Sequence, residues 1–144
     1  MFDEYSAGAI LFSLNENSYK MEYLLLHNTS GHWEFPKGNF EVGEDGFETA
    51  RREICEETGI TDIEFVKDFE SKIEYYFKRS DKLVHKRVIF YMARTNTSKV
   101  ILSSEHDAYA WKEYNEAINQ LTYENAKDLL KKAKGVQNAS PCER

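Results

Sequence analysis

The sequence predicts an α/β domain in which a mixed β-sheet packs against helices. Three observations favour this class. An acidic, capped helix is predicted over residues 46–58. Apolar runs bounded by polar turns lie on both sides of it, as strands do. Apolar residues at helical spacing return near the C-terminus, and 144 residues are enough to enclose one core.

We expect one domain over residues 1–134 and a disordered tail over 135–144, where apolar periodicity ends. The acidic start MFDEYS lacks a basic leader, and no apolar run approaches the roughly 18 residues that span a bilayer. The two cysteines form no metal or redox spacing, so no disulfide is expected. The prediction is a cytoplasmic protein with no membrane partner, either a monomer or a weak dimer.

The pattern of apolar residues in the N-terminal part of the chain predicts two central strands. Residues 6–14 (SAGAILFSL) and 22–28 (EYLLLHN) are apolar runs joined by a polar turn. In the following segment, GHWEFPKG, Pro36 and Gly38 bracket Lys37 and fix the chain just before the acidic helix. Lys37 is therefore expected either to hold a phosphate oxygen as a point charge or to pair with a nearby carboxylate, and these two roles are compatible.

The acidic helix has defined ends. Asp45 and Glu48 form a capping-box pattern, and Gly59 supplies the left-handed residue that ends the last turn. One narrow arc of this helix is expected to be buried. It contains Phe47, Ala50, Ile54 and Thr58.

Three carboxylates, those of Glu53, Glu56 and Glu57, share the adjoining arc of this helix. Like charges at these spacings destabilise a helix by roughly 0.2–0.5 kcal/mol per pair, and a hard divalent cation with oxygen ligands would offset that repulsion. Such clusters are more often solvated helix faces. Here Arg52 lies four residues from both Glu48 and Glu56 and can brace carboxylates from the side, so a metal site is favoured.

The remaining elements complete the sheet and add helices. They are a strand beginning at 63–66, a hairpin of 71–77 with 83–94, a polar loop over 103–107, a short strand over 108–111, and helices over 115–120 and 123–134. Within the hairpin, alternation sends Tyr75 and Tyr76 to opposite faces, and an exposed aromatic beside a phosphate site can stack a base.

Charge is unevenly distributed. The formal net charge of the chain is −6. Residues 34–62 contain nine acidic and three basic residues, so this segment alone also has a net charge of −6. The acidity is thus local, whereas the hairpin is basic at Lys78, Arg79, Lys82, Lys86 and Arg87. This basic cluster could steer a polyphosphate, although its first three residues fit a solvated hairpin tip at least as well.

The segment Gly38–Ile60 fills every fixed position of the pattern G-x5-E-x7-R-E-U-x-E-E-x-G-U, the Nudix box, so the chain resembles the Nudix hydrolase family. This segment is called the box below. The resemblance implies the Nudix fold, a mixed β-sheet sandwiched between α-helices, with the catalytic loop–helix–loop at Gly38–Ile60. It also implies Mg²⁺ or Mn²⁺ as cofactor and a substrate in which a nucleoside diphosphate is linked to another group.

Residues 31–38 and the run Glu105-His106-x-x-Tyr109-x-Trp111 further resemble the asymmetric diadenosine tetraphosphate hydrolases of that family. The implied reaction is metal-dependent, asymmetric cleavage of diadenosine tetraphosphate to ATP and AMP by in-line attack of water. The implied metal residues are Glu53, Glu56, Glu57 and Glu105. The implied catalytic residues are Glu44, Arg52, Glu56 and Glu105, with Glu56 the favoured base and Glu105 its rival. The implied substrate-binding residues are His32, Lys37, Tyr75, Tyr76, Lys86 and Tyr109.

Two alternatives remain open. The same box could serve an RNA 5′-pyrophosphohydrolase, with the RNA 5′ end on the basic hairpin, or a hydrolase of another nucleoside-diphosphate compound. A non-catalytic nucleotide sensor is the answer from a different class. A sensor has no need of all three helix carboxylates, so the intact box argues against it.

Overall fold

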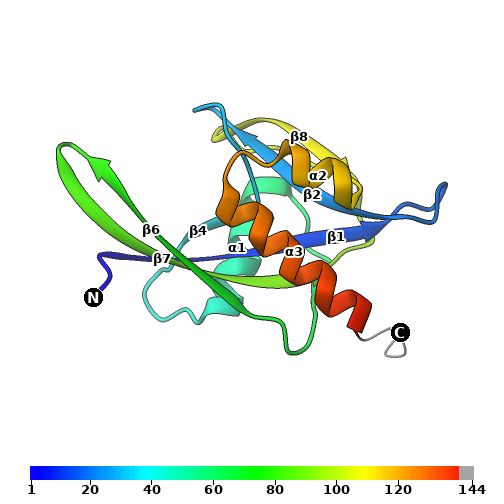
Figure 1. Cartoon of the computed structure of the whole chain (residues 1–144), viewed down its shortest axis with the longest axis horizontal. Coiled ribbons are helices and arrows are strands. Elements are labelled where there is room, and N and C mark those ends of the chain that lie inside the picture. Colours follow the sequence, from blue (N-terminus) through cyan, green and yellow to red (C-terminus); the bar gives the residue numbers. More distant parts are fainter. Residues whose placement is uncertain (140–144) are drawn as a thin grey trace.

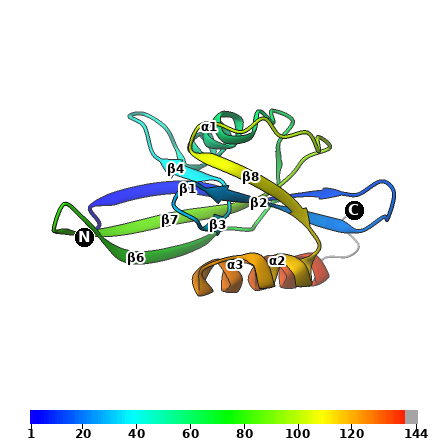
Figure 2. The ribbon, with the colours of Figure 1, turned by 90° about the horizontal axis from the view of Figure 1, so that it is seen from above.

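The computed structural model describes residues 1–139 and confirms the predicted fold class (Figure 1). The helices are α1 (Gly46–Thr58), α2 (Tyr114–Gln120) and α3 (Glu124–Ala139). The strands are β1 (Glu4–Leu14), β2 (Met21–Asn28), β3 (Trp33–Glu34), β4 (Lys37–Asn39), β5 (Glu64–Phe65), β6 (Ser71–Arg79), β7 (Lys82–Arg94) and β8 (His106–Lys112). Figure 2 shows α1 on one side of the sheet and α2 and α3 on the other.

The sheet is mixed because β1 pairs with β7 in parallel while the other pairings are antiparallel. Its main order is β3-β2-β1-β7-β5, with β4 beside β1, β6 beside β7 and β8 beside β2. Since β7 occupies one edge of β1, the strands β2 and β4 share the other edge. The residues 12–14 of β1 face β2, and the residues 6–8 face β4. This arrangement places β4 against the N-terminal half of β1, next to α1.

The strand β1 lies between two apolar layers. Ile10 and Phe12 belong to the core under α2 and α3, whereas Ala9 and Leu11 belong to the core under α1. A strand buried on both faces needs apolar residues at consecutive positions, which is why residues 7–12 form an unbroken apolar run except for Gly8. The prediction of a central strand is confirmed.

The hairpin of β6 and β7 extends beyond the helices in Figure 1. Arg79 pairs with Lys82 across its end, leaving a turn of only two residues. Both of them, Ser80 and Asp81, have positive φ angles of 50° and 65°. Such turns match the right-handed twist of the flanking strands. The connection between the two predicted strands, 71–77 and 83–94, is therefore shorter than expected, a tight two-residue turn.

One residue of the predicted buried arc is exposed. Ala50, Ile54 and Thr58 are fully buried, but 46% of the surface of Phe47 is accessible. Phe47 lies in the first turn of α1, where its ring stacks on Tyr91 at a centroid distance of 4.1 Å. Phe65 also contacts this ring edge-on at a centroid distance of 5.1 Å, yet nearly half of the residue stays in solvent, so the prediction was wrong for Phe47.

The prediction that the last helix ends at Lys134 is also wrong. The helix α3 continues through Gly135 to Ala139. Two contacts explain this extension: Val136 packs against the core, and the Tyr23 hydroxyl donates to Gln137 Oε1 at 2.6 Å. The rest of the predicted tail, residues 140–144, lies outside the described residues.

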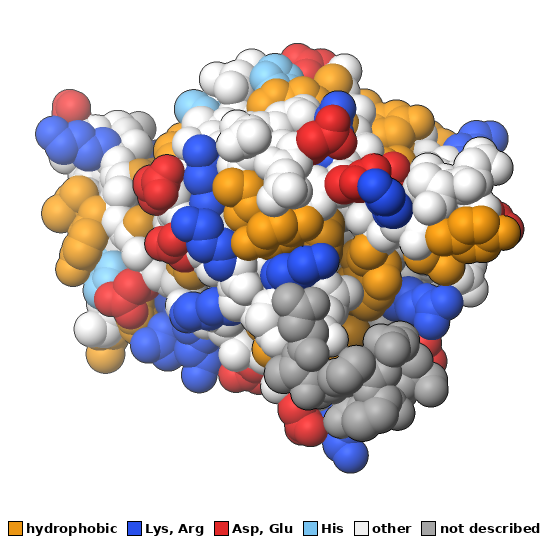
Figure 3. Space-filling model, turned by 45° about the vertical axis from the view of Figure 1, so that its right-hand side comes forward, with side chains coloured by type: hydrophobic (Ala, Val, Ile, Leu, Met, Phe, Trp, Pro, Cys, Tyr) orange, Lys and Arg blue, Asp and Glu red, His pale blue; other side chains and the backbone are white. Residues whose placement is uncertain are grey.

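The surface carries both charge signs. On the face shown in Figure 3, acidic and basic side chains are interspersed. Within residues 1–139, no helix has the length and apolar character needed to cross a membrane.

Candidate active site

The helix α1 is held at both ends as predicted. The Asp45 side chain accepts from the backbone N–H of Glu48 at 2.8 Å, and the Glu48 side chain accepts from the backbone N–H of Asp45 at 2.8 Å. Gly59 has a φ of 76°, and its N–H donates to the Cys55 carbonyl at 2.8 Å. These caps satisfy backbone groups that a helix leaves unpaired and fix its length.

Arg52 connects the loop before α1 with the carboxylates of the helix. Its Nε donates to Glu44 Oε2 at 2.7 Å, and its Nη1 donates to Glu53 Oε2 at 2.7 Å and to Glu56 Oε2 at 3.1 Å. Its Nη2 donates to the backbone carbonyl of Asn39 at 2.8 Å. The hydrogen bonds from Arg52, followed by that from the Thr49 hydroxyl, lower the pKa of Glu44 to about 2. The predicted bracing role of Arg52 thus has a geometric basis.

Glu57 is buried, with only 4% of its surface accessible, although the sequence predicted burial only for the neighbouring arc of the helix. Its Oε1 has no hydrogen-bond partner among the described residues. Burial, and next the Glu53 carboxylate, raise the pKa of Glu57 to about 9. A carboxylate in this position is costly without a positive partner.

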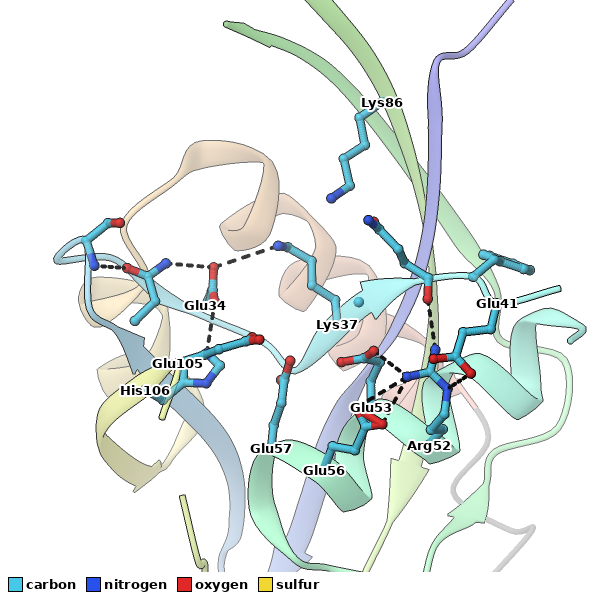
Figure 4. Close-up of a pocket in the computed structure, with 15 residues that line it drawn as sticks. Glu34, Lys37, Glu41, Arg52, Glu53, Glu56, Glu57, Lys86, Glu105 and His106 are labelled. Atoms are coloured by element: carbon cyan, nitrogen blue, oxygen red, sulfur yellow. Dashed lines mark hydrogen bonds and ion pairs between the residues drawn. The ribbon is translucent and has the colours of Figure 1, made fainter. Parts of the chain in front are cut away.

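The expected convergence of three helix carboxylates is realised only in part. Glu53 and Glu56 both turn toward Arg52, while Glu57 points into the cavity (Figure 4). Within residues 1–139, no three acidic, histidine or cysteine side chains form a preformed metal cage. The donor set is nonetheless one that hard divalent cations prefer, and the orphaned Glu57 Oε1 would gain a partner from such an ion. The residues present therefore fit Mg²⁺ or Mn²⁺.

Gly38 allows β4 to approach α1 closely. A Cβ atom at this position would overlap the Glu53 carboxylate. The absence of a side chain at the start of the box is thus a requirement of the site, since the backbone of β4 forms one wall next to Glu53.

These residues surround a cavity of about 550 Å³, a volume typical of small-molecule sites. Of the predicted site residues, it is lined by Lys37, Arg52, Glu53, Glu56, Glu57, Lys86 and Glu105. Figure 4 shows the Glu105 side chain extending from the far wall toward Glu57. The structure thus brings together the box and the later glutamate, which are far apart in the sequence.

Two lysines supply positive charge above the carboxylates (Figure 4). Lys37 Nζ lies 3.9 Å from Glu34 Oε1, and Lys86 Nζ lies 3.8 Å from Glu4 Oε1. Only 12% of the Lys86 side chain is accessible, and burial, followed by the Lys37 ammonium, lowers the pKa of Lys86. Two ammonium groups close enough to repel each other could hold an anion between them.

The four predicted aromatic residues lie outside the cavity lining. Tyr75 is opposite Lys86 in the hairpin, so it shares the face of the sheet that carries this lysine. Tyr76 is on the opposite face and stacks on His85, at a centroid distance of 4.2 Å. His32 packs against Tyr123, and Tyr109, which is 42% exposed, pairs with Leu26 across β8 and β2. Tyr75 is therefore the better placed of the two hairpin tyrosines.

Sequence reasoning missed several cavity residues, above all Glu34. The side chain of Glu34 is 19% accessible, and its Oε2 lies 3.1 Å from Nε2 of His106. Burial opposes ionisation, but the His106 hydrogen bond and the Lys37 charge outweigh it and hold the pKa of Glu34 below its usual value. A charged residue between two large apolar residues, Trp33 and Phe35, was the available signal.

Comparisons with known proteins give a consistent result. Residues 4–133 match the family described as NUDIX domain. The Mus musculus bis(5′-nucleosyl)-tetraphosphatase (asymmetrical) is 34% identical over 116 residues, which cover 76% of each chain. The crystal structure of a C. elegans Ap4A hydrolase binary complex superposes with a TM-score of 0.83 at 29% identity, covering 94% of this chain and 98% of that one. The Caulobacter vibrioides RNA pyrophosphohydrolase is 47% identical over only 45 residues, 31% of this chain and 26% of that protein.

Proposed function

This chain belongs to the Nudix family of hydrolases, and on that premise we propose that it cleaves diadenosine tetraphosphate asymmetrically to ATP and AMP. The observation that carries the proposal is the single cavity lined by both the box carboxylates and two lysines. The carboxylates suit a divalent cation and the lysines suit a chain of phosphates. The names of the relatives that match over most of their length point to the same reaction.

The residues that would hold Mg²⁺ or Mn²⁺ are Glu53 and Glu57, assisted by Glu56, whereas Glu105, which the resemblance also implied as a ligand, is assigned to proton transfer. When bound, the cation would neutralise the negative charge of phosphate oxygens and make a water molecule more acidic. Arg52 fixes the direction of the Glu53 and Glu56 carboxylates, and Glu44 in turn holds Arg52. Preorganisation of this kind keeps the ligands in place before substrate arrives.

The base that accepts the proton of the attacking water is the side chain of Glu105 in this proposal. Glu56, which the sequence favoured, has its carboxylate engaged by Arg52. Glu105 lines the same cavity, and its carboxylate has no recorded hydrogen bond or ion pair with the described residues. A free carboxylate beside the reacting phosphate is better able to take up a proton than one bound to a guanidinium.

Lys37 and Lys86 are assigned to the remaining phosphates of the substrate, those that leave as part of ATP. Tyr75, on the same face as Lys86, is assigned to one adenine, because base–aromatic stacking contributes roughly 1–3 kcal/mol per base. Tyr123, which is 49% exposed and packs against His32 at 5.0 Å, offers a second ring on the same side of the sheet as α3. A base clamp at a fixed distance from the carboxylates would select which phosphate is attacked.

A substrate panel tests this proposal. The purified protein is incubated with Mg²⁺ and, separately, with diadenosine tetraphosphate, ATP and triphosphorylated RNA, and products are separated by anion-exchange chromatography. Glu57→Gln protein prepared in the same way controls for contaminating hydrolases. The expected result is fastest consumption of diadenosine tetraphosphate with equal amounts of ATP and AMP.

A second candidate, release of pyrophosphate from an RNA 5′ end, is favoured by the Caulobacter vibrioides relative and by the basic hairpin. That match covers only 45 residues, 31% of this chain, however, and the hairpin residue Arg79 is already paired with Glu4. Inertness toward dinucleotides together with pyrophosphate release from RNA would replace our proposal with this one.

A further inference from the structure

Glu34 is an ionised carboxylate inside a cavity that we assign to a polyphosphate. An anion in that place repels the substrate, so its presence requires a reason. Glu34 contacts three polar side chains that come from different strands or loops: Nε2 of His106 at 3.1 Å, Nδ2 of Asn28 at 3.1 Å and Nζ of Lys37 at 3.9 Å (Figure 4). One carboxylate thus joins both walls of the cavity.

The His106 contact fixes the start of β8. Only 3% of the His106 side chain is accessible, and an ionised carboxylate can only accept, so the proton must lie on Nε2. His106 also pairs with Asn28 across β8 and β2, at a point where the register of the two strands shifts. At such an irregularity the backbone hydrogen bonds between β2 and β8 do not alone fix the position of the chain. The hydrogen bonds that the Glu34 carboxylate accepts from Asn28 and His106 add a further restraint.

Glu105 depends on this restraint because it directly precedes His106. Its carbonyl accepts from the Thr29 N–H at 3.2 Å and its N–H donates to Ser103 Oγ at 3.3 Å, but its carboxylate has no recorded partner in the described part of the chain. The Glu105 side chain is therefore positioned only through its backbone, which the Glu34–His106 bond anchors.

The Lys37 contact acts on the other wall. Glu34 is the only carboxylate of residues 1–139 within ion-pair distance of Lys37 Nζ. A lysine has a flexible stem with several rotatable bonds, so a fixed negative partner restricts where its ammonium lies. Lys37 can keep this partner and still donate to a phosphate, because an ammonium has three N–H groups.

We propose that Glu34 is a positioning residue for hydrolysis, one that aims Glu105 through His106 and holds Lys37 for the phosphates. The inference rests on the proposed function, since it uses the roles given there to Glu105 and Lys37. The proposal predicts two separable effects of removing the negative charge of Glu34. Misplacement of Glu105 lowers kcat, and misplacement of Lys37 raises KM.

The test compares Glu34→Gln, His106→Gln and the double variant with wild type, using the nucleotide that the wild-type protein cleaves fastest. A different substrate preference therefore changes the proposed function and leaves this test intact. Each single variant should lower kcat about 10- to 100-fold, the usual effect of a partner that orients a catalytic ligand. The double variant should lose no more than the worse single one, because both disrupt one connection. Glu34→Gln alone should raise KM.

Asp107→Asn is the matched control, because it removes a carboxylate next to His106 that is exposed and pairs with His27 instead. It should keep wild-type kinetics. Hydrogen–deuterium exchange in EDTA provides a readout without turnover: the segment 101–108 should lose protection in Glu34→Gln and His106→Gln but not in the control.

Several results would overturn the inference. Unchanged kcat with unchanged or lower KM in Glu34→Gln would mean that this carboxylate is only a repulsive charge. Losses of kcat that multiply in the double variant would show that Glu34 does not act through His106. If Glu34→Gln does not fold, His106→Gln with wild-type kcat and wild-type exchange would have the same consequence.

Discussion

Replacement of Glu57 by Gln should stabilise the metal-free protein while abolishing most of its activity. Glu57 is 4% exposed and its Oε1 has no partner among the described residues. Burial, and next the Glu53 carboxylate, raise the pKa of Glu57 to about 9 from an ordinary value of 4.5. The fold thus contains a carboxyl group that is destabilised as an anion.

The sign of the pH dependence follows from that shift. Between pH 4.5 and about 9, the folded protein keeps a proton on Glu57 that the unfolded chain has released. Unfolding therefore releases a proton, and the free energy of unfolding of the metal-free protein falls as the pH rises through this window, by at most about 1.4 kcal/mol per pH unit. Gln has the same shape and no charge. At pH 8 that slope sets an upper limit of about 5 kcal/mol on the gain from Glu57→Gln. Because the buried Gln amide also needs hydrogen-bond partners, we expect a gain of about 1–3 kcal/mol, or about 2–10 °C in Tm.

Thermal melting in EDTA at pH 6 and pH 8 measures this effect, and titration with Mg²⁺ measures the opposite one. Wild type should gain about 2.7 kcal/mol when Mg²⁺ is in 100-fold excess over its Kd, whereas Glu57→Gln should gain far less. Glu16→Gln, in the exposed turn between β1 and β2, is the matched control and should behave as wild type. A Glu57→Gln protein that melts no higher than wild type in EDTA would refute the burial argument. Normal turnover together with a normal response to Mg²⁺ would show that Glu57 is not a required ligand.

Three further predictions address other residues of the site. Gly38→Ala should displace Glu53 and weaken Mn²⁺ binding, measured by calorimetry, about 10- to 100-fold, since the new Cβ overlaps that carboxylate; unchanged affinity would mean that Glu53 is not a ligand. Glu105→Gln should lower kcat at least about 100-fold with little change in KM, as expected for a general base, whereas a loss confined to KM would move Glu105 from chemistry to binding. Tyr75→Ala should raise KM by a factor that corresponds to roughly 1–3 kcal/mol and Tyr76→Ala should not, because only Tyr75 shares a face with Lys86; the reverse order would contradict the assignment.

The pattern of neighbouring residues in the sequence was sufficient to predict features that depend on contacts within a few positions. The ends of α1 follow from Asp45, Glu48 and Gly59, whose contacts span only a few positions, and the structure confirms them. The bracing of Glu56 by Arg52 was accessible for the same reason, because the two residues lie four positions apart on the helix. Glu48, the other neighbour expected at this spacing, caps the helix instead.

Contacts between distant segments could not be predicted in this way. The length of α3 depends on a hydrogen bond from Tyr23 to Gln137, residues 114 positions apart. The pairing of Glu34 with His106 spans 72 positions, and no periodicity reveals it. Burial of Glu57 likewise depends on where β4 and the loop before β8 lie relative to α1. Such features follow only from the assembled sheet.

Cleavage of diadenosine tetraphosphate in ¹⁸O-labelled water tests the central claim most directly. The reaction contains Mg²⁺ and wild-type protein, and mass spectrometry locates the label in each product. If carboxylates, lysines and Tyr75 act as proposed, water attacks the phosphorus next to one adenosine, and the products are ATP and AMP with the label in AMP alone. Two molecules of ADP, or label in ATP, would contradict this account.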